Sequence, residues 1–454
     1  MPHSSIVHDL RSAHSADALL TGAPLPTLLY FALPIILGNI FQQLYSIVDA
    51  IVVGNFLGDL PLSGISVASP IVDVANALVI GGTIGVGVLC AHYCGAGEGE
   101  RLRCMNATAL LGGGALTLLI ALCGIFFSTP LLRAQGTEEA VCREAAVYLR
   151  LVFAGLLFCF LYNYYAAMLR SCGNSRTPFL ILLLSSTLHA LLDVLFVGVF
   201  GWGIRGVAFS TVLCQALAAA ACILYAQRRC PPLLLRPADL RFDRQMARLV
   251  LSYAWAAALQ QAVVCIGRLL VQGMLTPLGT STVTGYNMSL RTEQFLFCFS
   301  QGISAAMVVC LSQNLGHGDR PRARRFFRIS VLVELALIAL LGTVCFLFPA
   351  RIVGLFSDNA DVIAAGAQYT GAMAYLYVFA YLGEVIQGFF RGLGRLRLTM
   401  VASLLQVLLR VVLSYLLIPV WGMYGICAAV VSGWVLLAGI EGAYAVRKSR
   451  ALAA

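Results

Sequence analysis

Apolar runs recur along the whole chain, and each is about as long as the stretch of roughly 20 residues that crosses a bilayer core as an α-helix. Short segments rich in glycine, arginine and other polar residues separate these runs. Taken in order, the runs predict twelve membrane-spanning helices and hence an all-α polytopic membrane protein. The approximate ranges are 28–53, 65–93, 106–129, 146–169, 178–200, 206–227, 249–275, 285–313, 328–348, 369–390, 398–418 and 424–446.

The composition agrees with this pattern. Hydrophobic residues make up 60% of the chain and charged residues 11%, whereas soluble domains carry about 25% charged residues. An ordinary soluble domain is therefore excluded. The tail of residues 1–24 is polar and has no hydrophobic segment of its own, so no cleavable signal peptide is expected.

The basic residues predict how the chain is oriented in the membrane. Of the 30 Lys and Arg residues, 22 fall in the tails and in the loops of one side, and only five fall on the other side. Cytoplasmic loops carry the excess of Lys and Arg, so both termini are predicted to be cytoplasmic, in a plasma membrane. The net charge of +10 follows from this topology and indicates no nucleic-acid partner.

An internal repeat divides the chain into two pseudo-symmetric six-helix bundles. Four pairs of segments match in order, at a nearly constant separation along the chain. The predicted organisation is a cytoplasmic tail (1–24), an N-terminal lobe (25–227), a cytoplasmic linker (228–248), a C-terminal lobe (249–446) and a second cytoplasmic tail (447–454). The matching pairs are FQQLYSIVDAIVVG from Phe41 with LQQAVVCIGRLLVQ from Leu259, GAGEGER from Gly95 with GHGDRPR from Gly316, MLRSCGNSR from Met168 with FFRGLGRLR from Phe389, and GWGIRG from Gly201 with VWGMYG from Val420.

The first predicted helix carries a polar seam. Asn39, Gln42, Ser46 and Asp49 recur at steps of three and four residues and so share one helix face. An intramembrane carboxylate costs at least ~2.5 kcal/mol, and such residues usually face the protein interior or a water-filled cavity. Pro34 removes a backbone hydrogen bond and favours a hinge. The alternative is that Pro34 only starts the helix and Asp49 forms a static pair.

These motifs together resemble the multidrug and toxic compound extrusion (MATE) family, within a superfamily that also contains lipid-linked oligosaccharide flippases. The segments that carry the resemblance are VDAIVVG around Asp49, the glycine signatures after helices two and eight, LRSCGN after helix four, LLDVLFVGVFGWGIRG through helices five and six, and RTEQ in helix eight.

The resemblance implies that Asp49 and Asp193 share a cavity in the N-terminal lobe with Asn163 and Thr211. His189, four residues before Asp193, stands where many relatives have asparagine; it either titrates during transport or is a neutral core histidine. Gln42 and the tyrosines near the cavity complete the predicted N-lobe site. Tyr45, Tyr162, Tyr164 and Tyr165 either offer aromatic faces to an organic cation or pack between helices.

The C-terminal lobe carries its own candidate ion site. Glu293 lies in the RTEQ segment, and Glu384 aligns with Asn163 at the separation of the repeat. Asp73 in the second helix and Arg268 are further candidates. Arg268, Arg291 and Arg410 lie in or at the edge of predicted helices, where they either neutralise these acids or bind a phosphate-containing substrate.

The sequence thus favours a cation-coupled antiporter that exports amphipathic or cationic organic compounds, with H⁺ or Na⁺ as the coupling ion, by alternating access. The alternative is a flippase-like exporter of a lipid or lipid-linked glycan. No enzyme motif or nucleotide-binding loop is found, so neither a cofactor nor an ATPase subunit is expected. Cys90, His92 and Cys94 lack a fourth ligand nearby in the sequence, so no metal site is predicted there either.

Overall fold

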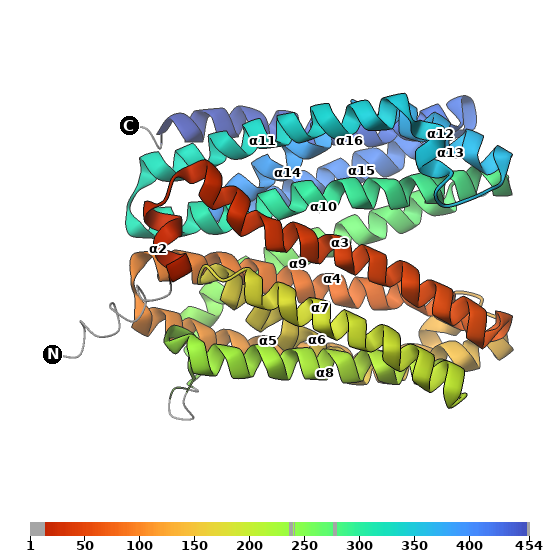
Figure 1. The fold of residues 1–454 in the computed structure, drawn as a ribbon, viewed down its shortest axis with the longest axis horizontal. Coiled ribbons are helices and arrows are strands. Elements are labelled where there is room, and N and C mark those ends of the chain that lie inside the picture. Colours follow the sequence, from red (N-terminus) through yellow and green to blue (C-terminus); the bar gives the residue numbers. More distant parts are fainter. Residues whose placement is uncertain (1–13, 236–238, 240, 276–278, 452–454) are drawn as a thin grey trace. The chain divides into compact units, whose positions relative to one another are not determined.

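The computed structural model describes residues 14–235, 239, 241–275 and 279–451, and within them the chain is helical with no strand (Figure 1). The elements are α2 (His14–Thr21), α3 (Pro24–Leu57), α4 (Asp59–Ala96), α5 (Gly99–Ala134), α6 (Glu139–Ser171), α7 (Arg176–Asp193), the π-helical η1 (Val194–Val199), α8 (Ile204–Arg229), the 3-10 turn η2 (Pro231–Leu233), α9 (Arg244–Gly273), α10 (Thr280–His317), α11 (Arg320–Leu347), α12 (Pro349–Val353), α13 (Ala360–Met373), α14 (Tyr377–Gly392), α15 (Leu396–Trp421) and α16 (Met423–Ala451).

Eleven helices in the described part of the chain are long and apolar enough to cross a membrane, and a bent pair would make a twelfth span. The bent pair is α13 and α14, whose axes differ by 58°. The sequence predicted one continuous helix over 369–390, so that prediction was wrong in detail. The break lies where α11 approaches closely: a Cβ on Gly342 would lie 2.8 Å from the carbonyl oxygen of Ala374.

The repeat is built on glycines with left-handed backbone geometry. Eight of them form four pairs at matching positions of the two halves, and their φ angles lie between 54° and 92°. Only glycine adopts this region without steric cost, so these positions end or start helices at equivalent points of both halves. The pairs are Gly58 with Gly279, Gly97 with Gly318, Gly173 with Gly394, and Gly203 with Gly422.

The helices pack into two compact units. Of the described residues, those within 14–18 and 37–262 form unit 1, and those within 19–36 and 263–451 form unit 2. Relative to the predicted lobes, the first part of α3 groups with the second unit and the first part of α9 groups with the first. Each unit therefore contains most of one half of the repeat and a piece of the leading helix of the other half.

Glycines permit this exchange of helix segments. In unit 1, a Cβ on Gly81 of α4 would lie 2.6 Å from the Cα of Ala258 in α9. In unit 2, a Cβ on Gly302 of α10 would lie 3.1 Å from the backbone nitrogen of Ile36 in α3. The two glycines occupy equivalent positions of the repeat. In both halves, a glycine without a side chain on the second helix therefore allows the leading helix of the other half to pack closely against it.

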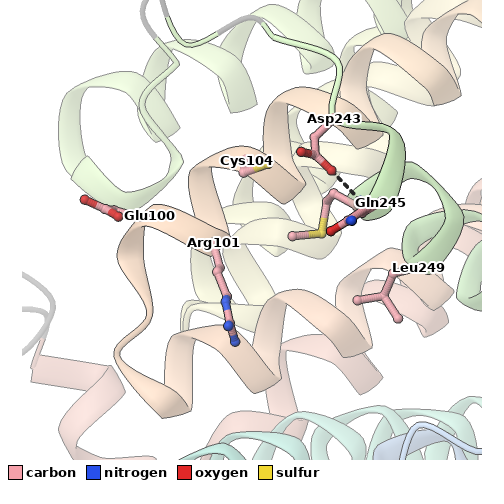
Figure 2. A pocket seen from close by; sticks show the side chains of 7 residues that line it. Glu100, Arg101, Cys104, Asp243, Gln245 and Leu249 are labelled. Carbon is pink, nitrogen blue, oxygen red and sulfur yellow. Dashed lines mark hydrogen bonds between the residues drawn. The ribbon is translucent and has the colours of Figure 1, made fainter.

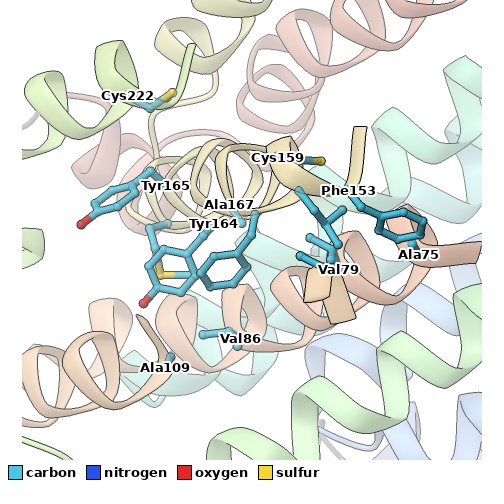
Figure 3. Packing of buried hydrophobic residues seen from close by; sticks show 14 of the residues in the cluster. Ala75, Val79, Val86, Ala109, Phe153, Cys159, Tyr164, Tyr165, Ala167 and Cys222 are labelled. Carbon is cyan, nitrogen blue, oxygen red and sulfur yellow. The ribbon is translucent and has the colours of Figure 1, made fainter. Parts of the chain in front are cut away.

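The core of unit 1 lies between α4, α5 and α6 (Figure 3). Tyr164 is fully buried in it, and its hydroxyl donates a hydrogen bond of 2.6 Å to Asn106 Oδ1. Tyr165 is also buried and meets the Tyr164 ring edge-on at a centroid distance of 5.5 Å. Of the two interpretations of these tyrosines, packing is the correct one, because their rings lie in the hydrophobic core.

The linker is anchored to unit 1. Leu233, in η2, is buried, and its carbonyl accepts a hydrogen bond of 3.0 Å from Asn106 Nδ2. At the other end of the linker, Asp243 Oδ1 accepts a hydrogen bond of 2.6 Å from the backbone N–H of Met246 and so caps the start of α9. The helix that follows is thereby fixed in direction where it leaves the linker.

Candidate functional site

A buried polar cluster surrounds Asp193 in unit 1. Asp193 is the last residue of α7 and is completely inaccessible to solvent. His189, one turn earlier, places Nδ1 2.9 Å from Asp193 Oδ2. From α8, Ser210 donates a short hydrogen bond to Asp193 Oδ1, and Thr211 Oγ1 lies 2.9 Å from His189 Nε2. The structure therefore brings together three predicted site residues, His189, Asp193 and Thr211.

The hydrogen-bond directions define how the cluster holds protons. Thr211 donates its hydroxyl hydrogen to the carbonyl of Val207 at 2.8 Å, so it accepts from His189, whose Nε2 carries a proton. The contact between Nδ1 and Asp193 then needs one further proton. It resides either on the imidazole, giving an ion pair, or on the carboxyl group. Removing that proton would set the lone pair of Nδ1 against the carboxylate, so the geometry of the cluster is coupled to its protonation.

Ser210 was not identified from the sequence. Its hydroxyl lies between Asp193 and the carbonyl of Val207, to which it also donates at 2.8 Å. Because one hydroxyl carries one hydrogen, these two bonds compete, and the outcome depends on whether Asp193 is ionised. Ser210 directly precedes Thr211 on α8, and the two hydroxyl groups contact Asp193 and His189, which are one turn apart on α7. This pair of adjacent hydroxyl residues in the sequence is the feature that could have revealed Ser210.

The backbone changes form directly after Asp193. The π-helical segment η1, Val194–Val199, follows α7 without interruption. Segments of π-helix are rare and occur frequently at functional sites. On the next turn, Gly198 lies against Phe56 of α3, since a Cβ there would be 3.1 Å from the Phe56 ring. The irregular segment thus packs against the helix that carries Asp49.

The remaining predicted N-lobe residues are not joined to this cluster by any described contact. Asn163 donates to the carbonyl of Cys159 on its own helix at 2.8 Å. Gln42 is exposed on α3. The side chains of Asp49 and Tyr45 lie outside the described residues. Pro34 lies within the continuous helix α3 and groups with unit 2.

In unit 2, Glu293 of α10 lies among aromatic side chains. It is buried, and its Oε2 accepts hydrogen bonds of 3.4 Å from the hydroxyls of Tyr369 and Tyr377. Arg410 and Arg268 lie within electrostatic range of it. No described arginine contacts Glu293 directly, so the two guanidinium groups act on its carboxyl group only at a distance.

Glu384 occupies a different, more crowded charge cluster. Its Oε1 lies 2.5 Å from Arg391 Nη2. Two further glutamates, Glu334 of α11 and Glu441 of α16, are completely inaccessible and make no ion pair within the described residues; the Ser300 side chain lies close to Glu334. Glu334 lies within electrostatic range of Glu384, and Glu441 within range of both Glu384 and Arg391. One guanidinium cannot neutralise the partly buried Glu384 and two completely buried carboxylates, so the buried acids require protons or a cation.

Glu334 and Glu441 were missed in the sequence, although the rule that singled out Asp49 applies to them. Each is a lone acid in an apolar run, LVELAL and AGIEGA. The two further candidates, Asp73 and Arg268, are both exposed on their helices, α4 and α9.

The ion pair between Glu384 and Arg391 gives a stability prediction. Arg391→Gln leaves three acids without a guanidinium, and because the pair is partly buried, its loss should cost on the order of 1–3 kcal/mol, between an exposed and a buried pair. We expect the variant to unfold at a clearly lower temperature in detergent. The matched control is Arg397→Gln, which removes an exposed guanidinium from the next helix; equal unfolding temperatures for the two variants would contradict a structural role for the pair.

One open pocket of about 420 Å³ lies in unit 1, at the starts of α5 and α9 (Figure 2). It contains none of the predicted site residues, and Figure 2 shows Asp243 and Arg101 on different sides of it. The lining residues are Glu100, Arg101, Cys104, Asp243, Gln245, Met246 and Leu249.

Long apolar helices, an internal repeat and buried ionisable residues in those helices together define a multi-pass membrane transport protein. The family model MatE matches residues 34–195 and again 256–416, more than half of the chain, so the chain belongs to this family of MATE transporters. One matched segment lies in each predicted lobe, in agreement with the predicted repeat.

Relatives and solved structures agree with this assignment. "Probable multidrug resistance protein YpnP" of Bacillus subtilis is 27% identical over 387 residues, which is 85% of this chain and 86% of that protein. The "FAD transporter" of Shewanella oneidensis is 26% identical over 76% of this chain and 77% of its own. A MOP superfamily transporter from Pyrococcus furiosus, described with a binding pocket of reverse polarity, has the same fold, with a TM-score of 0.89 at 19% identity over 96% of this chain and 98% of that one.

Proposed function

We propose that this protein is a secondary active exporter of amphipathic or cationic organic compounds, driven by antiport with protons. Its place in the MATE family and relatives named as multidrug resistance proteins support export of small molecules. The proton-holding cluster of His189, Asp193, Ser210 and Thr211 is the observation that carries the coupling mechanism.

The coupling ion is proposed to be H⁺ because Nδ1 of His189 lies 2.9 Å from Oδ2 of Asp193. A sodium ion prefers oxygen ligands. In this arrangement the His189 ring contacts one carboxylate oxygen of Asp193, so that oxygen is not open to sodium. Protonation of Asp193 breaks its charge interaction with His189 and changes which group Ser210 donates to. Such a rearrangement beside the π-helical segment is the proposed link between proton binding and helix movement.

Asp49 is proposed as the second acid of this mechanism and Pro34 as the hinge of α3. The polar seam that includes Gln42 and Asp49 and the helix that continues through Pro34 support these roles. The C-terminal acids Glu293 and Glu384 are proposed as a second ion site, extended by Glu334 and Glu441. No ATPase subunit, cofactor or enzymatic activity is part of this proposal.

The protein is proposed to lie in the plasma membrane with both termini in the cytoplasm. The asymmetry of basic residues between the two sides of the predicted topology supports this orientation. Modification of single cysteines introduced into the tails, in intact and in permeabilised cells, tests it.

The coupling ion is tested in proteoliposomes with imposed gradients of H⁺, Na⁺ or voltage. A pH gradient of one unit supplies about 1.4 kcal/mol, which supports about a tenfold gradient of substrate in a one-for-one exchange. We expect a pH gradient alone to drive transport of a cationic dye. Transport that follows only the sodium gradient contradicts the proposal. With a monovalent cation as substrate, one-for-one exchange moves no net charge, so voltage alone will have no effect.

A second candidate function, export of an anionic lipid-linked or nucleotide-like compound, is favoured by one observation. In unit 2, Arg268 and Arg410 both lie within electrostatic range of Glu293, which leaves a local excess of positive charge. A relative is named an FAD transporter, and FAD carries phosphates.

The charge of the substrate separates these two functions. If the substrate is anionic, Arg410→Gln lowers its transport at least about tenfold, because a charge-assisted contact contributes on the order of 1.5–3 kcal/mol, and leaves cationic dyes unaffected. If the substrate is cationic, the same variant leaves dye transport unchanged or raises it. Arg397→Gln serves as the control, and the readout is initial uptake of one cationic and one anionic fluorescent compound.

A further inference from the structure

Three cysteines from two helices meet at one end of unit 1. Their Sγ atoms, of Cys90, Cys94 and Cys172, all lie within 4.8 Å of one another. The sulfurs of Cys94 and Cys172 are separated by 3.3 Å. Cys90 and Cys94 are one turn apart on α4, and Cys172 directly follows α6, so the group is assembled by the packing of these helices.

The surroundings hold these sulfurs in place. Ser171 donates a hydrogen bond of 2.7 Å to the carbonyl of Gly87, which ties α6 to α4 one turn before Cys90. Cys90 is completely buried, while Cys94 and Cys172 are partly accessible. The site is therefore closed on one side and open on the other, as entry of an ion requires.

A fourth cysteine lies close by. Cys230 follows α8 at the start of the linker, is partly buried, and lies within electrostatic range of both Cys94 and Cys172. His92, the residue between Cys90 and Cys94 that the sequence also suggested, is exposed. A ligand that the sequence alone did not reveal, Cys172, thus comes from much further along the chain, and Cys230 lies nearby but outside the group of sulfurs within 4.8 Å of one another.

We propose that Cys90, Cys94 and Cys172 form a thiolate site for a soft metal ion, Zn²⁺ or Cu⁺, with Cys230 as the fourth ligand. Zinc binds thiolates at about 2.3 Å in tetrahedral geometry, which places the sulfurs about 3.8 Å apart. The observed group of sulfurs needs only small side-chain adjustments to reach that spacing. Cu⁺ also prefers thiolates, and three of them satisfy it.

The chemistry of the location favours a metal over a disulfide. These helix ends face the side predicted to be cytoplasmic, where thiols are kept reduced. Binding releases the thiol protons, because the ligands are thiolates. A bound ion joins α4, α6 and the linker that leads to α9, so it stabilises the attachment of the linker to unit 1.

The test uses the full-length protein in detergent under reducing conditions, stripped by a chelator and titrated with Zn²⁺ and, anaerobically, with Cu⁺. We expect one ion per chain, counted by elemental mass spectrometry. Cys94→Ser and Cys172→Ser should each weaken binding at least about tenfold, since even outer-shell changes cost 10- to 100-fold. Cys104→Ser, a partly buried thiol of the same unit outside the cluster, should bind like the unmodified protein.

A second measurement guards against misfolded variants. In the unmodified protein, saturating metal should protect the partly accessible Cys94 and Cys172 from alkylation, but not the exposed Cys123, as read by peptide mass spectrometry. Absence of protection by both ions overturns the proposal. So does binding by the two serine variants that equals that of the unmodified protein, or a disulfide between Cys94 and Cys172 in protein purified under reducing conditions. The ion that protects at the lower concentration identifies the metal.

Discussion

Replacing Asp193 by asparagine is expected to abolish proton-driven export while the protein still folds. The amide is nearly the same size and can still form hydrogen bonds with His189 and Ser210, but it cannot take up or release a proton. With a pH gradient of one unit, the unmodified protein should build about a tenfold substrate gradient in a one-for-one exchange, and Asp193→Asn should build none. The measurement is steady-state dye accumulation in proteoliposomes.

Two variants separate coupling from general damage. Asp361→Asn makes the same chemical change at an exposed carboxyl in the first turn of α13 and should transport normally. His189→Asn replaces the imidazole by an amide that does not titrate; we expect it to fold and to transport with a weaker dependence on pH. Undiminished proton-driven accumulation by Asp193→Asn would place the coupling site elsewhere, with the cluster of Glu334, Glu384 and Glu441 as the alternative.

The second large effect is expected on stability, from Gly85→Ala. A Cβ at this position of α4 would lie 2.6 Å from the carbonyl carbon of Tyr253 and 2.9 Å from the Cα of Ala254, both backbone atoms of α9. No side-chain rotation can relieve such contacts, so the two helices must separate. Overpacking of this kind costs about 1–3 kcal/mol, and the thermal unfolding temperature in detergent should fall accordingly.

Gly82→Ala is the matched control, because it lies on the same helix and a Cβ there meets nothing within 4 Å. Alanine is the better helix former, so this variant should unfold at the same or a higher temperature. If both alanine variants unfold alike, the close approach of α4 and α9 is not maintained in the protein in solution.

The helices and the repeat could be predicted from the sequence for physical reasons. A bilayer core requires long apolar runs, and these runs are visible without any tertiary information. The glycine signatures mark backbone positions with positive φ, such as Gly97 and Gly318, that few other residues adopt. Apolar runs and positive-φ glycines are local features of the sequence, so the approximate positions of the helix ends could be predicted from them.

The assembly of the sites could not be predicted in the same way. Ser210 meets Asp193, and Cys172 meets Cys90 and Cys94, because α7 packs on α8 and α6 packs on α4; sequence spacing does not report helix pairing. The break between α13 and α14 has no proline to announce it. Asn163, placed in the cavity by resemblance alone, makes its described hydrogen bond to the carbonyl of Cys159, one turn earlier on the same helix.

The exchange of leading-helix segments between the units has a consequence for biosynthesis. Residues 19–36 leave the ribosome long before α10, against which Ile36 packs at Gly302, has been translated. Likewise, Gly81 and Gly85 of α4 cannot pack against α9 until α9 has been translated. Neither unit can be finished until translation has passed the midpoint of the chain, so the nascent first half must persist in the membrane as an incomplete bundle, and a ribosome that stalls in the linker leaves a fragment with its glycine faces uncovered.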